Sequence, residues 1–386
     1  MSANGWATLP PGVDAERGFL ARPDPLVAFD PGRHDGLVGE YLSRLDELGG
    51  TLPERLEAGD LRPAVRNLEP PPAGALADLT EGELVRVRQL SSFLASAYVN
   101  EVGADPVDRL PAGAAVPLYR SSSRLDRRPV VAYDVLCLHN FRRDDQGGGF
   151  DVETVDTVQQ FTSLDDERWF VAVHVAIEAA AAPALTACPR AQRAVARDDP
   201  SSLEDALETV ADSLEDQTDI MRRMTEGNDP AVFASEFRPY FDGFADVVFE
   251  GVDELAGEPQ SLRGASGAQS AVLPALDATL GVEHEATALL DVLGDMRSYM
   301  PPSHRAAVEA FEAGPDVRRY VAGRDDRSLV AAFNRCVDRL GTFRRVHFEQ
   351  VVQYVREVAE TTAGTGGTDF VPFLERMRAE TEARKL

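Results

Sequence analysis

The sequence predicts a mainly α-helical protein, with a smaller, mostly helical N-terminal domain and a large all-helical C-terminal domain. Apolar residues recur at steps of three and four along several long stretches, which is the period of one helix face. Strand-like alternation is scarce, and its best candidate, residues 129–138, suits a helix equally well. Prolines and residues that favour helix starts separate the stretches, so their ends can be placed approximately.

The composition describes an acidic folded protein. Its 386 residues carry 65 Asp and Glu against 39 Lys and Arg, a formal charge of −26, and 44% are hydrophobic. Such a chain repels nucleic acids and anionic membranes, and we expect neither as a partner. Lys385 is the single lysine. An acid-rich, lysine-poor chain is typical of a halophilic microbe, whose proteins need salt to screen self-repulsion.

Targeting and redox signals are not evident in the sequence. Residues 1–11 contain neither a basic segment nor an apolar one, and no run of 18 apolar residues occurs, so we expect a cytoplasmic protein. Cys137, Cys188 and Cys336 lie too far apart for a zinc-binding pair. They are predicted to be buried thiols.

Prolines divide the first third of the chain. Two amphipathic stretches there, 36–48 and 80–99, are predicted helices. Residues 104–129 contain four prolines, a run of serines and several arginines, so they are predicted to be irregular. We therefore expect a small domain over 1–105, a linker over 106–128 and a large domain over 129–386.

Helical patterns fill the large domain. Ser163, followed by three acidic residues, indicates a helix start, and the pattern 168–182 ends before Pro183. Further predicted helices cover 203–223, 272–299 with an interruption, 304–313, 328–360 and 371–384.

One histidine lies inside the longest apolar stripe. The stripe runs at steps of three and four through Phe333, Val337, Leu340, Phe343, His347, Val351, Tyr354 and Val358. A buried imidazole needs a partner. Two interpretations stay open from spacing alone: a core histidine bonded to the backbone, or a ligand of a metal or a haem iron.

A second histidine repeats this arrangement. His174 shares an apolar helix face with Phe170 and Ile177. Two such rings make a pocket plausible, with one ring on a metal and the other opposite. Neither histidine belongs to an HExxH or HxxxH pair, which argues against zinc. Glu178, four residues after His174, is expected to make a local contact or a buried hydrogen bond.

Three weaker candidates lie in loops. Residues 264–268 nearly match the GxSxG nucleophile motif, but no strand precedes them, so a tight loop entering a helix is the simpler interpretation. The Gly/Thr-rich loop 364–368 lacks the lysine of a P-loop and is either a linker or a lid over a ligand. Arg238, between aromatic residues, either reaches the surface or pairs with a carboxylate.

Several of these segments together resemble the indoleamine 2,3-dioxygenase family. The matching stretches are Gly294–Arg305 (GDMRSYMPPSHR), Arg344–His347 (RRVH) and Gly364–Asp369 (GTGGTD), with weaker echoes at 265–270 and 248–251. The resemblance implies a helical enzyme with haem b, which inserts O2 across the indole C2–C3 bond of L-tryptophan and gives N-formylkynurenine, the first step of the kynurenine pathway. It also implies a need for an electron donor that keeps the iron ferrous, and we expect a monomer.

The resemblance assigns roles residue by residue. His347 matches the axial iron ligand, Arg344 the partner of a haem propionate, and Asp277 an acid linked to that arginine. The remaining matches are positions around the substrate and the haem: the distal aromatics Tyr133, Phe170 and Phe233, the carboxylate-binding Arg238, the haem-side loop residues Ser266 and Gly267, and the lid hydroxyl of Thr365.

His174 departs from the family pattern, because mammalian members carry serine there. A distal histidine is instead similar to the separate tryptophan 2,3-dioxygenase family. His174 is thus expected to act in catalysis, with Ser266 and Thr365, either by accepting the indole N–H or by hydrogen-bonding O2. Two alternatives stay open: a haem relative that binds O2 without turnover, and a dioxygenase of another indole.

Overall fold

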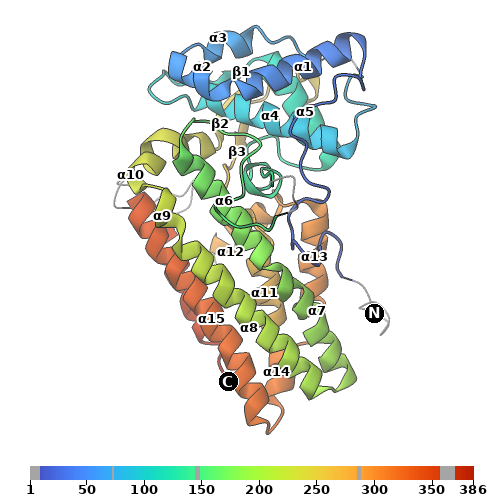
Figure 1. The fold of residues 1–386 in the computed structure, drawn as a ribbon, viewed down its shortest axis with the longest axis vertical. Helices are drawn as coiled ribbons and strands as arrows, with labels where there is room; N and C mark the ends of the chain where they lie inside the picture. Colours follow the sequence, from blue (N-terminus) through green and yellow to red (C-terminus); the bar gives the residue numbers. More distant parts are fainter. Residues whose placement is uncertain (1–8, 72–73, 144–147, 285–287, 357–369) are drawn as a thin grey trace.

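The computed structural model describes residues 9–71, 74–143, 148–284, 288–356 and 370–386, and its architecture is mainly helical, as predicted (Figure 1). The helices of the N-terminal part are α1 (Gly36–Gly50), α2 (Leu52–Ala58), α3 (Leu61–Arg66), α4 (Glu81–Val99) and α5 (Ala112–Leu125). They form one layer at one end of the molecule (Figure 1). The start of α4 is fixed by a capping box, in which Thr80 and Glu83 bond each other's backbone N–H.

The next segment combines long helices with short irregular ones. It contains η1 (Asp134–Leu138), α6 (Asp165–Ala180), α7 (Ala182–Arg197), α8 (Pro200–Arg222), α9 (Met224–Gly227), α10 (Pro230–Val232), η2 (Phe233–Phe237), η3 (Arg238–Phe241), η4 (Asp253–Leu255) and η5 (Gly267–Gln269). The turns η1 and η2 are π-helical, and η3, η4 and η5 are 3-10 helices.

The C-terminal segment completes the helical body. It contains α11 (Val272–Leu280), α12 (Ala288–Arg297), α13 (Pro302–Glu312), α14 (Val317–Ala322), α15 (Arg327–Val351), the π-helical η6 (Val352–Arg356) and α16 (Phe370–Glu382). Helices α8 and α15 run side by side along the length of the molecule (Figure 1).

A three-stranded sheet lies below the N-terminal layer (Figure 1). β1 (Arg109–Leu110) pairs in parallel with β2 (Phe244–Phe249), and β2 pairs antiparallel with β3 (Gln260–Leu262). The ladder is irregular between Phe244 and Val247. Because β1 precedes α5 and β2 belongs to the large segment, the sheet ties the two parts together.

Residues 104–129 differ from the predicted irregular chain, because α5 occupies most of them. Pro117 lies inside α5, where it removes one backbone donor. Burial of Ala114, Ala115 and Leu118 against α4 and α3 compensates for that loss. Gly113 is required by close packing, since a Cβ there would stand 1.9 Å from the Leu68 carbonyl oxygen. The division into domains stays a prediction.

Residues 134–138 form the π-helical η1, so of the strand and helix left open for 129–138 the structure has the helix there. One other local expectation was wrong. Ser163 does not cap α6: its hydroxyl donates to Glu57, and the helix begins at Asp165. The predicted end before Pro183 is a junction, because α7 follows α6 after Ala181.

The stretch Asp165–Arg197, which covers α6 and α7, contains a window of mean hydropathy 1.6 that is long and apolar enough to cross a membrane. Of that window, 67% is buried inside the fold. A core helix meets the same description, because helices buried on most sides are apolar all round.

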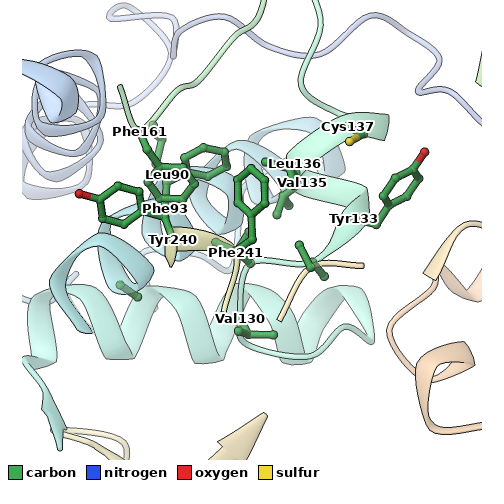
Figure 2. Packing of buried hydrophobic residues seen from close by; sticks show 14 of the residues in the cluster. Leu90, Phe93, Val130, Tyr133, Val135, Leu136, Cys137, Phe161, Tyr240 and Phe241 are labelled. Atoms are coloured by element: carbon green, nitrogen blue, oxygen red, sulfur yellow. The ribbon is translucent and has the colours of Figure 1, made fainter. Parts of the chain in front are cut away.

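Two buried hydrophobic clusters form the core. One joins the N-terminal layer to α6, η2 and η3, and the other joins α7, α8, α11, α13 and α15. In the first cluster, Phe161 stacks between Phe93 and Tyr240, with ring centroids 4.3 and 4.9 Å apart (Figure 2). Tyr133 lies at the edge of this cluster and points away from the stack (Figure 2).

Candidate functional site

A large cavity lies where the two core clusters meet. Its volume is about 810 Å³, and its walls are mostly apolar side chains from both clusters. Eight of the residues singled out in the sequence line it: Tyr133, Phe170, His174, Phe233, Gly267, Asp277, Arg344 and His347. A cavity of this size and character is typical of a cofactor or small-molecule site.

His347 lies on the cavity wall, on the α15 face that the apolar stripe predicted. Phe333, Val337 and Leu340 of the stripe are fully buried, whereas His347 is half-buried at the cavity. Among the residues that the structure describes, none hydrogen-bonds its ring. Burial, then the proximity of His174 and Arg344, lowers the pKa of His347 to about 4. The ring is therefore neutral at pH 7, with a nitrogen lone pair available.

Arg344 and Asp277 lie in contact beside His347. Arg344 precedes His347 by one helical turn, and its Nη2 donates to Oδ2 of Asp277 on α11 at 2.6 Å. The other end of the guanidinium contacts the Thr381 hydroxyl of α16. Both charged groups are nearly buried, and Arg344 holds the pKa of Asp277 below its ordinary value against the effect of burial. The role of Arg344 toward a propionate stays a prediction.

A second part of the cavity wall is aromatic. The Phe170 ring lies 5.3 Å from Phe233 and 5.5 Å from Phe241, and Tyr354 stands edge-on to Phe233 at 5.6 Å. The Tyr354 hydroxyl donates to the Asn228 carbonyl at 2.6 Å, which fixes its ring. Tilted and edge-on pairs at these separations form a rigid surface that suits a flat aromatic ligand.

Three π-helical turns place aromatic residues of this cavity. Tyr133 caps η1, Phe233 begins η2 and Tyr354 belongs to η6, and all three line the cavity. A π-turn inserts one extra residue into a helix and re-aims the following side chains, and such turns are frequent at functional sites. No sequence signal indicated these turns.

His174 lies against the aromatic wall. Its ring centroid is 4.4 Å from that of Phe170, and its Nδ1 is 2.8 Å from the Phe170 carbonyl oxygen. Burial lowers the pKa of His174, so the ring is neutral. Because a carbonyl can only accept, Nδ1 carries the proton and Nε2 is left as an acceptor.

Glu178 is a polar group of the cavity, and it makes the buried hydrogen bond that was one of the two contacts expected for it. Its Oε1 accepts hydrogen bonds from the Tyr133 hydroxyl at 3.0 Å and the Ser270 hydroxyl at 2.6 Å. Burial raises the pKa of Glu178 to about 7. The carboxyl group thus fixes the Tyr133 ring. In the sequence, only the four-residue spacing from His174 had drawn attention to Glu178.

Two expected site residues, Ser266 and Arg238, do not line this cavity, and a third, Thr365, cannot be placed relative to it. Ser266 caps the short helix η5 through its hydroxyl, which accepts from Ala268 N–H at 3.3 Å, and its neighbour Gly267 reaches the cavity instead. Arg238 is half-buried at the start of η3, directly after the cavity-lining turn η2. Thr365 lies outside the described residues.

Among the residues that the structure describes, neither a cysteine nor a cluster of metal ligands lines the cavity. Cys137, Cys188 and Cys336 are buried free thiols, as predicted. Within the part of the chain that the structure describes, no three His, Cys, Asp or Glu side chains group as metal ligands. Iron held by a porphyrin needs only one axial imidazole from the protein, so His347 alone suffices.

Comparison with known proteins identifies the family. The family model described as indoleamine 2,3-dioxygenase matches residues 11–384, nearly the whole chain. The chain belongs to the indoleamine 2,3-dioxygenase family.

Proteins similar to this chain come from animals and from yeast. Indoleamine 2,3-dioxygenase 1 of Mus musculus is 31% identical over 96% of this chain and 93% of its own length. The indoleamine 2,3-dioxygenase of Saccharomyces cerevisiae is 29% identical over 96% of this chain and 92% of its own. A protein named myoglobin, from Haliotis madaka, is 26% identical over 96% of both chains.

Indoleamine 2,3-dioxygenases bind haem, and the cavity of this chain suits that group. The unpartnered, neutral imidazole of His347 lies on an apolar cavity, as an axial ligand requires. Arg344 stands one turn away and offers a guanidinium for a propionate. Gly267 leaves open space beside the cavity, since a Cβ there would meet no atom within 4 Å.

A pH-dependent contribution to stability follows from the ion network behind Arg344. The His284 ring contacts Asp277 (3.3 Å) and Glu380 (2.6 Å). Burial opposes its charged form, but these carboxylates outweigh burial and raise its pKa. This contribution is therefore full below pH 6.5 and lost as pH rises through the higher folded-state pKa.

We expect the unfolding free energy of the wild type to fall relative to that of His284→Gln as pH rises from about 6.5 into the alkaline range. Urea unfolding at several pH values measures the difference. A constant difference across this range would contradict the assignment.

Proposed function

We propose that this protein is a haem-dependent dioxygenase that inserts O2 across the indole C2–C3 bond of L-tryptophan and gives N-formylkynurenine. One observation carries the proposal: the same apolar cavity is lined by the unpartnered His347, by a set of packed aromatic rings and by His174. The family and its named relatives support the same reaction.

The haem, when bound, supplies the activation of O2, and the protein supplies ligation, orientation and exclusion of water. His347 holds the iron and Arg344 binds a propionate. The rings of Tyr133, Phe170 and Phe233 hold the flat indole, and the apolar walls keep water out.

His174 is proposed to accept the indole N–H. Its Nδ1 proton is engaged with the Phe170 carbonyl, so its Nε2 can accept but not donate while the ring is neutral. This supports the indole contact over a hydrogen bond donated to O2. The variant His174→Ser, which carries the serine of mammalian relatives, tests which of these two contacts His174 makes.

Arg238 is proposed to bind the substrate carboxylate, because it follows η2, the turn that carries the cavity-lining Phe233. Arg238→Leu should then lower kcat/KM for L-tryptophan by the equivalent of about 2–4 kcal/mol, with a raised KM, because a charged pair is lost. Steady-state kinetics measure this, with Arg335→Leu, an exposed arginine of α15, as the control. An unchanged KM in Arg238→Leu would remove Arg238 from the site.

Direct turnover tests the function. Anaerobic ferrous protein with L-tryptophan is mixed with oxygenated buffer, and absorbance of N-formylkynurenine is followed. We expect product formation, and weaker activity with tryptamine, which lacks the carboxylate. Efficient turnover of tryptamine or D-tryptophan but not L-tryptophan would assign a different indole substrate.

A second candidate function is O2 binding without turnover. The myoglobin of Haliotis madaka, similar over 96% of this chain, favours it. In the same experiment, flat product absorbance together with a stable spectrum of the O2-bound protein would support this candidate and reject the dioxygenase.

A further inference from the structure

Four arginines converge on a second cavity beside the first. Its volume is about 490 Å³, and its walls include Arg127, Arg128, Arg297, Arg305, Asp126 and Ser298. Arg127 and Arg128 follow α5, Arg297 ends α12, and Arg305 belongs to α13. The fold thus brings together guanidinium groups from segments about 170 residues apart.

Short contacts hold these groups in place. Arg305 donates to the Met300 carbonyl at 2.9 Å and to Oδ2 of Asp126 at 2.5 Å. Arg128 Nε lies 3.3 Å from the Ser298 hydroxyl oxygen, and its guanidinium lies 5.9 Å from the Tyr299 ring centroid. The side chains are therefore ordered around the cavity and lose little freedom when a ligand binds.

Carboxylates do not balance the positive charge here. Arg127 shares Asp134 with the buried Arg88, and Arg297 pairs with Glu312. Arg128, Arg305 and Asp126 complete the group. Among the residues that the structure describes, five arginines thus face three carboxylates, a local charge of +2 in a chain of net charge −26. The nearby Asp295 is already paired with Arg263 at 2.5 Å.

The pKa values of buried groups near these arginines reflect the same excess of positive charge. Burial, and then repulsion from Arg88 and Arg305 against the attraction of Asp134, lowers the pKa of Arg127. The buried His139 and His304 have pKa values of about 4 and about 3, first through burial and also through Arg127. Both rings are neutral at pH 7, so they add no charge and leave the arginines uncompensated.

Arg128 is the group free to bind. Among the described residues no carboxylate pairs with it, and its side chain is exposed. We infer that this arginine cavity binds a small oxyanion, a phosphate or carboxylate group, between Arg128, Arg297 and Arg305, with the Ser298 hydroxyl as a further donor. Guanidinium groups match both anions with paired hydrogen bonds.

The site lies next to the main cavity, because Gly294 and Arg297 line both. A bound anion therefore stands at the border of the proposed haem and substrate cavity. Binding of the anion does not require turnover, so a binding experiment tests this site independently of the proposed function.

Thermal unfolding of the purified full-length protein tests the site. Sodium phosphate, sodium acetate and sodium chloride are titrated at constant ionic strength, and Tm is recorded. We expect phosphate, acetate or both to raise Tm in a saturable way while chloride does not. The anion that acts at lower concentration identifies the preferred chemistry.

Two variants locate the binding. Arg128→Gln should weaken the apparent affinity at least tenfold, and Arg297→Gln, tested separately, should do the same and keeps the test open if the first variant fails to fold. Arg142→Gln, an exposed arginine elsewhere, should bind as the wild type does. Equal effects of all three salts, or wild-type affinity in both cavity variants, would overturn the inference.

Discussion

Replacement of His347 by alanine is expected to abolish stable haem binding. His347 supplies the imidazole that lines the main cavity from α15, and the alanine methyl group cannot coordinate iron. The purified variant, supplied with hemin, should show no Soret band, whereas wild type and Arg345→Gln should. Arg345 is the matched control because it lies on the same helix but is exposed, paired with Glu349 at 2.8 Å.

Chemical rescue separates loss of the ligand from loss of the fold. His347 is only half-buried, so His347→Gly should keep the far-ultraviolet circular dichroism of the wild type. Added imidazole should then restore a Soret band by filling the vacated space. A normal Soret band in His347→Ala without imidazole would remove the assignment of His347 as the ligand.

Replacement of Asp134 by asparagine is expected to cost about 3–5 kcal/mol of unfolding free energy. Asp134 Oδ2 accepts from Arg88 at 2.9 Å and Arg127 at 3.2 Å, and Asp134 and Arg88 are almost fully buried. Both arginines hold the pKa of Asp134 low against burial, so the group is charged. The amide would leave two guanidinium charges uncompensated in the interior.

Urea unfolding measures this effect, and Asp219→Asn provides the comparison. Asp219 pairs with Arg222 at 2.5 Å on the surface of α8, where both side chains are about half exposed or more, so its loss should cost less than about 1 kcal/mol. Similar costs in the two variants would show that the Asp134 pair contributes no more than a surface contact.

The Asp134 variant also probes what the N-terminal layer contributes to the site. Arg88 belongs to α4, and its neighbour Gln89 donates to the carbonyls of Val135 (3.2 Å) and His139 (3.0 Å). These contacts hold η1, and so Tyr133, at the cavity wall. The N-terminal residues therefore position the distal wall, which the sequence could not indicate because the partners lie about 46 residues apart.

The helices were predictable where their signals are local. The apolar stripe through Phe333 and Leu340 placed α15 and put His347 on its buried face. A helix face is set by side chains three and four residues apart, which any reader of the sequence can see. Family motifs then supplied a role for that histidine, which periodicity had left open.

The errors arose where distant contacts override local preference. The prolines and serines of 104–129 favour irregular chain, but packing of α5 on α4 stabilises a helix there. Ser163 is a good capping residue, yet Glu167 binds the N–H groups of Phe161 and Thr162 and reshapes the turn before α6.

The sequence by itself determined the helical class, the acidic surface, the two cavity-facing histidines and the family, because these depend on composition, on short-range periodicity and on motifs. Only the tertiary structure decided which side chains meet. It set the His174 tautomer, the bond of Tyr133 to Glu178 and the four arginines around the second cavity. These depend on contacts between segments far apart in the chain, and local sequence does not encode such distances.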